Sequence, residues 1–212
     1  MSWKSLSRSP LSGSVHAMPL SDPAPRESLH TRHVECRGFK RDDGLWDVEG
    51  HMTDVKSYVF INRWRGEIPV GTPLHEMWVR ITLDHRLTIL AIEVATDHAP
   101  FRMCSDILPN FQRLKGLRIG PGFKAKIKEL VGGTEGCTHI VELMGPMATT
   151  AFQTMANQRR GDLPGHFERP RRPPPMLNTC HTFASDSGVV QTEFPEFYTG
   201  TIDTSSGSAP PS

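Results

Sequence analysis

Cysteine and histidine side chains are the residues of this chain best suited to chemistry. Thiolate sulfur and imidazole nitrogen are the ligands that zinc and iron–sulfur clusters take in proteins, and a thiolate is also a nucleophile. The sequence assigns no catalytic residue and no site for an organic cofactor. We predict a Cys/His pocket for a metal, with ligands drawn from His75, Cys104, Cys137, His139, Cys180 and His181.

Cys137 and His139 stand two residues apart in Gly-Cys-Thr-His, before a helix that we expect to begin near Thr138. Unpaired N–H groups at a helix N-terminus stabilise a thiolate, the form that binds a metal or attacks an electrophile. If the chain is extended up to Thr138, the two side chains point the same way. The alternative is a buried cysteine beside a histidine in the first helical turn, and both readings stay open.

His75 and Cys104 belong to the pair of strands that the hydrophobic pattern marks most clearly. His75 alternates in phase with Met77 and Val79, so we expect it on the buried face of its strand. A buried imidazole needs a partner at each ring nitrogen, either a metal or a hydrogen-bonding group. Cys104 lies where a strand gives way to a helix, and Asp106 is most simply an acid favoured by the helix dipole.

Three other residues have simpler interpretations. Cys180 and His181 follow a Pro-rich segment, so they reach the pocket only if the chain returns to the core. Cys36 in the first expected strand is most simply a packing residue.

Asp54 is an acid on an apolar strand face, in phase with Met52. We interpret it as a structural ion pair with Lys56 or Arg80, or as an acid–base group. Standard signatures of metal and catalytic sites are absent, since the chain contains no C-x-x-C pair, H-E-x-x-H, G-x-S-x-G or P-loop.

The elements that must position these residues are strands first and helices afterwards. Hydrophobic alternation predicts strands over residues 35–41, 45–56, 74–84 and 87–96. Helical spacing predicts helices over 107–114, 123–131 and 138–155. We also expect a hairpin turn at 42–44, a loop over 63–72, a kink or a break into two helices at Pro146, and a short hairpin within 179–198. This order favours an α+β domain, an antiparallel sheet followed by two or three helices packed on one face.

Composition indicates a globular chain with polar ends. Its 212 residues suffice for one core, expected over residues 31–200 with a Pro/Arg-rich linker near 159–175. The Ser- and Pro-rich ends, residues 1–30 and 201–212, are expected to be disordered. The net charge of +1 provides no basic face for nucleic acid. Neither a membrane span nor a signal-peptide core is visible, so we expect a cytoplasmic protein whose four cysteines stay reduced.

Four segments of the chain carry a family likeness when they are read in order. They are Asp43-Gly44-Leu45-Trp46-Asp47-Val48-Glu49, Pro73-Leu74-His75-Glu76-Met77, Gly136-Cys137-Thr138-His139 and Asn178-Thr179-Cys180-His181. These motifs resemble a bacterial family of uncharacterised proteins, domain-of-unknown-function family 2889, over roughly Thr31 to Gly200. The resemblance implies no activity.

The order of strand, turn, strand, Cys104, helix, and Cys137 at a helix start is similar to the iron–sulfur cluster assembly scaffold proteins. That resemblance implies their fold and a metal pocket. In it His75 takes the first ligand place, Cys104 the second and Cys137 the third, with His139 close by.

Three functions follow as hypotheses. The first is a protein that binds zinc or an iron–sulfur cluster in the Cys/His pocket. The second is a non-catalytic interaction or regulatory module, whose unknown protein partner is an enzyme encoded nearby. The third is an acyl or thiol transferase with Cys137 as nucleophile, His139 or His75 as base, and Glu142 or Asp106 orienting that base.

Overall fold

A computed structural model describes residues 20–161, 173–174 and 176–201 of the chain. The chain divides into two compact units, residues 1–154 and 155–212, whereas the sequence predicts one domain over 31–200. Most of the expected tails and linker, residues 1–19, 162–172, 175 and 202–212, lie outside the described residues.

A hairpin of two long strands begins the first unit. β1 (His30–Lys40) pairs with β2 (Trp46–Lys56) in antiparallel register along both strands. In the turn, Gly44 has a φ of +83°, a left-handed conformation that glycine adopts at little cost. The turn lies where the sequence predicts it, but β1 starts at His30 and not at residue 35.

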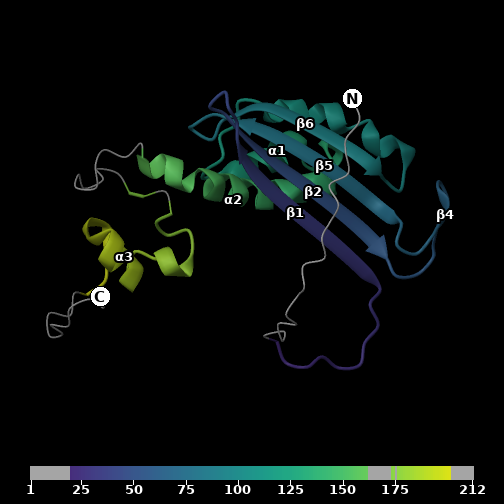
Figure 1. Ribbon diagram of the computed structural model, residues 1–212, viewed down its shortest axis with the longest axis horizontal. Coiled ribbons are helices and arrows are strands. Elements are labelled where there is room, and N and C mark those ends of the chain that lie inside the picture. Colours follow the sequence, from purple (N-terminus) through teal and green to yellow (C-terminus); the bar gives the residue numbers. More distant parts are fainter. Residues whose placement is uncertain (1–19, 162–172, 175, 202–212) are drawn as a thin grey trace. The chain divides into compact units, whose positions relative to one another are not determined.

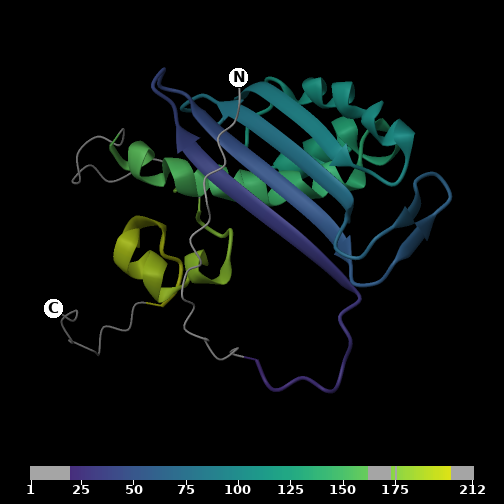
Figure 2. The ribbon, with the colours of Figure 1, turned by 45° about the vertical axis from the view of Figure 1, so that its right-hand side comes forward.

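β5 (Pro73–Leu83) and β6 (Ile89–His98) complete a four-stranded sheet in the order β1-β2-β5-β6, with neighbouring strands antiparallel (Figure 1). The connection from β2 to β5 carries a small hairpin, β3 (Phe60–Asn62) with β4 (Gly66–Ile68). Figure 2 shows this hairpin extending beyond the end of the larger sheet. Part of the segment expected to be a loop is therefore a strand.

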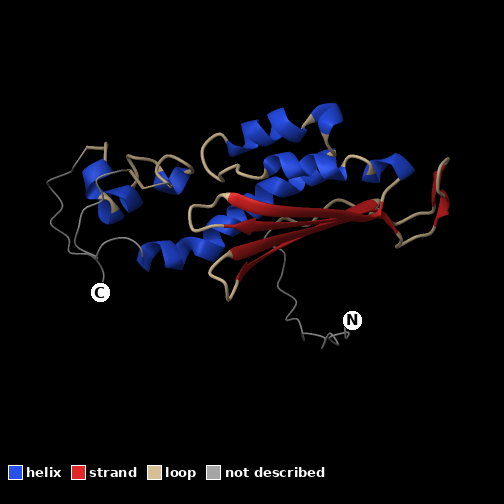
Figure 3. Ribbon diagram, turned by 90° about the horizontal axis from the view of Figure 1, so that it is seen from above, coloured by secondary structure: helices blue, strands red, loops and turns tan. Residues whose placement is uncertain are grey.

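Helices cover one face of the four-stranded sheet (Figure 3). They are, in chain order, the 3₁₀ helices η1 (Arg102–Ser105) and η2 (Leu108–Leu114), then α1 (Phe123–Val131), the short η3 (Gly133–Glu135) and α2 (Thr138–Gly161). The predicted α+β class, with an antiparallel sheet and helices on one face, is confirmed. In the part of the chain that the structure describes, no helix combines the length and apolar character that crossing a membrane requires.

Two details of the helices differ from expectation. The helix expected over 107–114 is the 3₁₀ helix η2. α2 continues past Pro146, so the predicted break into two helices does not occur. Met144 and Met147 on either side of the proline are fully buried, and this packing offsets the hydrogen bond that proline removes.

α2 approaches the sheet closely because glycines on β1 and β2 present no side chain to it. A Cβ atom at Gly50 would lie 2.7 Å from Sδ of Met147, and one at Gly38 would overlap the side chain of Thr154. The core between sheet and helix consists of buried apolar residues of both: Val48, Met52, Met77, Val79, Ile81, Leu143, Met144 and Met147. The N-terminal turn of α2 is thereby held beside the sheet.

The second unit contains η4 (His181–Phe183), α3 (Gly188–Glu193) and η5 (Pro195–Phe197). The side chain of Ser187 accepts the backbone N–H of Val190 and caps α3. This cap begins a helix at the position where a hairpin was predicted, and that prediction is wrong.

Candidate functional site

Asp54 is a carboxylate buried near the end of β2, on the helix-covered face of the sheet. It follows Met52 on that face, and only 1% of its surface is exposed. Arg32, directly across the β1–β2 ladder, donates Nε to Oδ1 at 2.7 Å and Nη2 to Oδ2 at 2.8 Å. Burial alone would raise the pKa of Asp54, but Arg32, with His75 and His30 nearby, outweighs burial and lowers it to about 2.

His75 lies opposite Asp54 on β5, on the face where the sequence analysis expects it. Its side chain is 13% exposed, and its Nδ1 lies 3.1 Å from Oδ2 of Asp54. This contact lacks the alignment of a hydrogen bond, so Nδ1 is buried without a hydrogen-bond partner among the described residues. Burial, together with the neighbouring His139, lowers the pKa of His75 to about 4, against the opposing effect of the Asp54 carboxylate. The imidazole is therefore neutral at neutral pH.

His139 enters the site from the first turn of α2. Its Nε2 lies 3.7 Å from Oδ2 of Asp54, and its ring centroid lies 3.9 Å from that of His75. Its Nδ1 faces Sγ of Cys137 at 3.8 Å. Cys137 and His139 therefore meet, as in the first of the two arrangements that the sequence left open, although His139 already lies in the first turn of α2, as in the second.

Cys137 and His139 shift each other's pKa. The hydrogen bond with Cys137 raises the pKa of His139, against the opposing effect of burial. Burial would raise the pKa of the Cys137 thiol, but His139 and the backbone N–H groups of Ile140 and His139 outweigh it and lower that pKa. The pair is shifted toward thiolate and imidazolium, as expected for a cysteine at a helix start.

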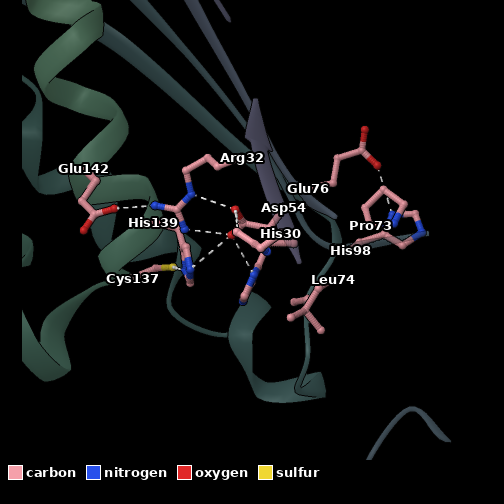
Figure 4. A network of polar contacts seen from close by, with 12 residues as sticks. His30, Arg32, Asp54, Pro73, Leu74, Glu76, His98, Cys137, His139 and Glu142 are labelled. Atoms are coloured by element: carbon pink, nitrogen blue, oxygen red, sulfur yellow. Dashed lines mark hydrogen bonds and ion pairs between the residues drawn. The ribbon is translucent and has the colours of Figure 1, made fainter. Parts of the chain in front are cut away.

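Asp54, His75 and His139 form a compact set of metal-ligand type drawn from β2, β5 and α2. One ligand atom from each residue lies within 4.8 Å of the other two. Figure 4 shows His139 and Asp54 directed toward each other, with Cys137 behind His139. Two imidazoles and a carboxylate are a donor set of zinc and non-haem iron(II) sites.

Arg32 connects the site to the outer side of α2. Its Nη1 donates to Oε2 of Glu142 at 2.9 Å, so one guanidinium bridges Asp54 and Glu142. The carboxylate next to His139 is therefore Asp54, while Glu142 pairs with Arg32 and Asp106 follows η1.

Four of the six predicted ligands lie outside this set: Cys137, which contacts the set through His139, and three others. Cys104 is half-buried in η1. Cys180 is exposed and immediately precedes η4 in the second unit, and His181 is the first residue of η4. Within the described residues, none of the three belongs to a group of three candidate ligands. Cys36 is half-buried on β1, as a packing residue would be.

The partners of Asp54 differ from those that the sequence predicts. Asp54 lies on the apolar face, as predicted, but it pairs with Arg32 and not with Lys56 or Arg80, and Arg80 pairs with Glu49. The register of the hairpin could have predicted the pairing of Arg32 with Asp54. The turn at 42–44 pairs Lys40 with Trp46, and counting back along both strands places Arg32 opposite Asp54.

The opposite face of the sheet carries a separate polar cluster. Glu76 follows His75 in β5 and so points the other way. It lies 3.2 Å from Nε2 of His51 and 3.1 Å from Nδ1 of His98, and His51 stacks on Trp78 with ring centroids 3.5 Å apart. These side chains do not form a described group close enough to hold an ion.

A family model described as "Protein of unknown function (DUF2889)" matches residues 30–153. The match includes every residue of the Asp54, His75 and His139 set, and it confirms the family resemblance seen in the sequence. It ends before residues 178–181, which carried the last of the four motifs. No curated protein and no solved structure matches the chain, and the resemblance to iron–sulfur scaffolds finds no support.

Proposed function

Since the chain belongs to the DUF2889 family of proteins of unknown function, we propose its function from the site alone. The protein binds one divalent transition metal ion, zinc or iron(II), through Asp54, His75 and His139. The observation that carries this proposal is the convergence of three ligand atoms within 4.8 Å of one another from three separate elements.

The state of His75 supports this proposal. A metal needs an unprotonated nitrogen, and burial keeps the His75 ring neutral. A buried ring nitrogen without a hydrogen bond costs free energy, and Nδ1 is such an atom among the described residues. A metal ion beside Asp54 would supply the missing partner.

The residues around His139 and Asp54 resemble those that hydrogen-bond to the ligands in known metal sites. A ligand histidine usually donates its second ring N–H to an acceptor, which fixes the ring. Cys137 occupies that place at Nδ1 of His139 and leaves Nε2 directed at Asp54. Charge also favours a cation, because Arg32 pairs with both Asp54 and Glu142 and so offsets only one of these two carboxylates.

The donor set favours a mononuclear site with an open position. Three protein ligands leave room for water or a substrate, as in catalytic zinc sites, whereas structural zinc sites have four. Iron–sulfur clusters are typically held by cysteine thiolates. Among the described residues, Cys137 is the cysteine that contacts this set, so a single ion fits better than a cluster.

The test is metal binding by stripped protein, measured by calorimetry and by elemental analysis after dialysis. We expect one zinc or iron(II) ion per chain, and an affinity loss of at least about 100-fold in His75→Ala. His98→Ala is the matched control, because it removes a histidine that bonds Glu76 on the opposite face. A native chain that takes up neither ion, or equal losses in both variants, would overturn the proposal.

A second candidate function rests on the line from Cys137 through His139 to Asp54. Sγ lies 3.8 Å from Nδ1 of His139, and Nε2 of that ring lies 3.7 Å from Asp54. This is the order of nucleophile, base and orienting acid. Cys137 would attack an acyl carbon, His139 would carry the proton to the leaving group, and Asp54 would stabilise the imidazolium.

The reactivity of Cys137 and its replacement by serine test the second candidate. In metal-free protein, we expect Cys137 to react with iodoacetamide faster than Cys36, whose thiol pKa is raised by burial. Peptide mapping by mass spectrometry reports each cysteine. Cys137→Ser should abolish a transferase activity, but it should leave zinc bound with an affinity reduced by about 10-fold, as for the loss of an outer-layer partner.

A further inference from the structure

A cavity of about 450 Å³ lies between α1 and the first half of α2. Its apolar wall includes Ile127, Val131 and Val141, and Cys137 also lines it. This volume is within the range of small-molecule sites, about 300–1,000 Å³. The cavity therefore adjoins the candidate site through a side chain that contacts His139.

A second cavity, of about 330 Å³, lies along the same two helices. Lys124 of α1 and Gly145 of α2 line both cavities. Cε of Lys124 would lie 3.8 Å from a Cβ atom at Gly145. The aliphatic stem of Lys124 thus rests over Gly145, where both cavities meet.

The charges around the larger cavity favour an anion. Lys124 and Lys128 line it from positions four residues apart, on one face of α1. In the described part of the chain neither lysine has an ion-pair partner, whereas Lys126 on the same helix pairs with Glu129 at 2.6 Å. Glu142 lines the same cavity, but it is paired with Arg32. An ammonium pair beside an apolar wall attracts a molecule with one negative end.

We propose that this cavity binds an organic carboxylate with an apolar body. The carboxylate pairs with Lys124 and Lys128, and the body lies against Ile127 and Val131 with access to Cys137. The apolar lining disfavours inorganic phosphate, which has no body to bury. The inference is independent of the metal, because none of the three proposed ligands lines the cavity.

Calorimetry on the full chain tests the proposal with octanoate, octylamine and inorganic phosphate as probes. We expect octanoate to bind at least about 10-fold more tightly than either of the others, since one ion pair or the apolar body is lost in each. Octylamine binding as tightly as octanoate, or no octanoate binding to the native chain, would overturn the proposal.

Matched variants locate the binding site. Replacing Lys124 and Lys128 together by Gln should weaken octanoate binding about 10-fold, whereas Lys126→Gln makes the same kind of change outside the cavity and should leave it unaltered. Gly145→Leu should block binding by filling the junction of the cavities, and Gly145→Ala should not. Equal effects of Lys126→Gln and the double change would contradict the proposal.

Zinc binding by the same variants separates the two proposals. If the double lysine variant loses octanoate but keeps zinc, the cavity is a separate binding site, as proposed. If His75→Ala loses zinc and keeps octanoate, the same conclusion follows from the other side. A native chain that binds zinc but no octanoate defeats only the carboxylate inference, and one that binds octanoate but no zinc defeats only the metal proposal.

Discussion

At the scale of single residues, Asp54 keeps its charge while buried because Arg32 contacts both carboxylate oxygens. Arg32→Ala removes this pairing, and we expect the free energy of unfolding to fall by about 2–3 kcal/mol. The figure is below that of a fully buried pair because the Arg32 side chain is 37% exposed. Urea unfolding of metal-free protein at neutral pH measures it.

Arg37→Ala is the control on the same strand. Arg37 meets Glu49 at 3.4 Å on the solvent side of β1, with 53% of its side chain exposed. An exposed pair of this kind contributes about 0–1 kcal/mol. Similar losses in the free energy of unfolding of the two variants would mean that the Arg32–Asp54 pair stabilises the fold no more than an exposed pair does.

His75 makes stability depend on pH below neutrality. Its pKa is about 4 in the folded chain and about 6.5 in an unfolded one. Between these two pKa values the unfolded chain therefore binds a proton that the folded chain does not bind, so stability falls as the pH drops through this range. We expect a loss of up to about 3 kcal/mol in metal-free protein, measured by urea unfolding at several pH values.

His75→Gln isolates that effect, because it leaves the other titrating groups in place. Its stability should vary less between about pH 6.5 and 4 than that of the native chain. His139 acts in the opposite sense, since its raised pKa adds stability at acid pH that is lost as the pH rises. The depressed pKa of Asp54 acts lower, between about 3.9 unfolded and about 2 folded. Parallel curves for variant and native chain would contradict the assignment.

Much of the site was visible in the sequence one residue at a time. His75 was placed by strand alternation, and Cys137 and His139 by their spacing before a helix. The sequence did not show that these residues meet around Asp54, because their contacts depend on the strand order and on how closely α2 approaches the sheet. Cys104 was included on local position alone, and nothing local reports what a side chain meets across the fold.

At the scale of elements, replacing two different glycines by alanine should change stability in opposite directions. Gly145→Ala in α2 should raise stability by about 0.5–1 kcal/mol, because alanine is the better helix former and its Cβ meets Lys124 only at 3.8 Å. Gly50→Ala in β2 should lower stability by about 1–3 kcal/mol, because its Cβ would lie 2.7 Å from Sδ of Met147. Thermal unfolding of both variants measures the pair, and a stabilised Gly50→Ala protein would show that α2 packs less closely than described.

β2, β5 and α1 were predicted to within one residue, whereas the continuity of α2 was not predicted, and the reason is physical. Alternation along β2 and β5 reflects one buried and one wet face, which is a local pattern. α2 contains Gly145 and Pro146, which both oppose a helix locally, and its continuity depends on packing against the sheet. Packing of α2 against the sheet outweighs the low helix propensity of these two residues, and the local sequence pattern does not reveal that packing.

At the scale of the whole molecule, the proposed ligands all come from residues 1–154, the first compact unit. We expect Cys180→Ser and His181→Gln, together in the full chain, to leave zinc affinity within about twofold, as for independent sites. Calorimetry of the stripped protein measures this. A loss as large as that of His75→Ala would mean that the second unit supplies a ligand.

The β1–β2 hairpin also restricts the length of the turn that is compatible with this site. Lys40 and Trp46 close the ladder, and the same register sets Arg32 against Asp54. An insertion or deletion of one residue in the turn would slip the ladder and rotate the guanidinium to the solvent side. Relatives that keep this arginine and acid should therefore hold the length of the turn fixed, and alignment gaps should fall elsewhere.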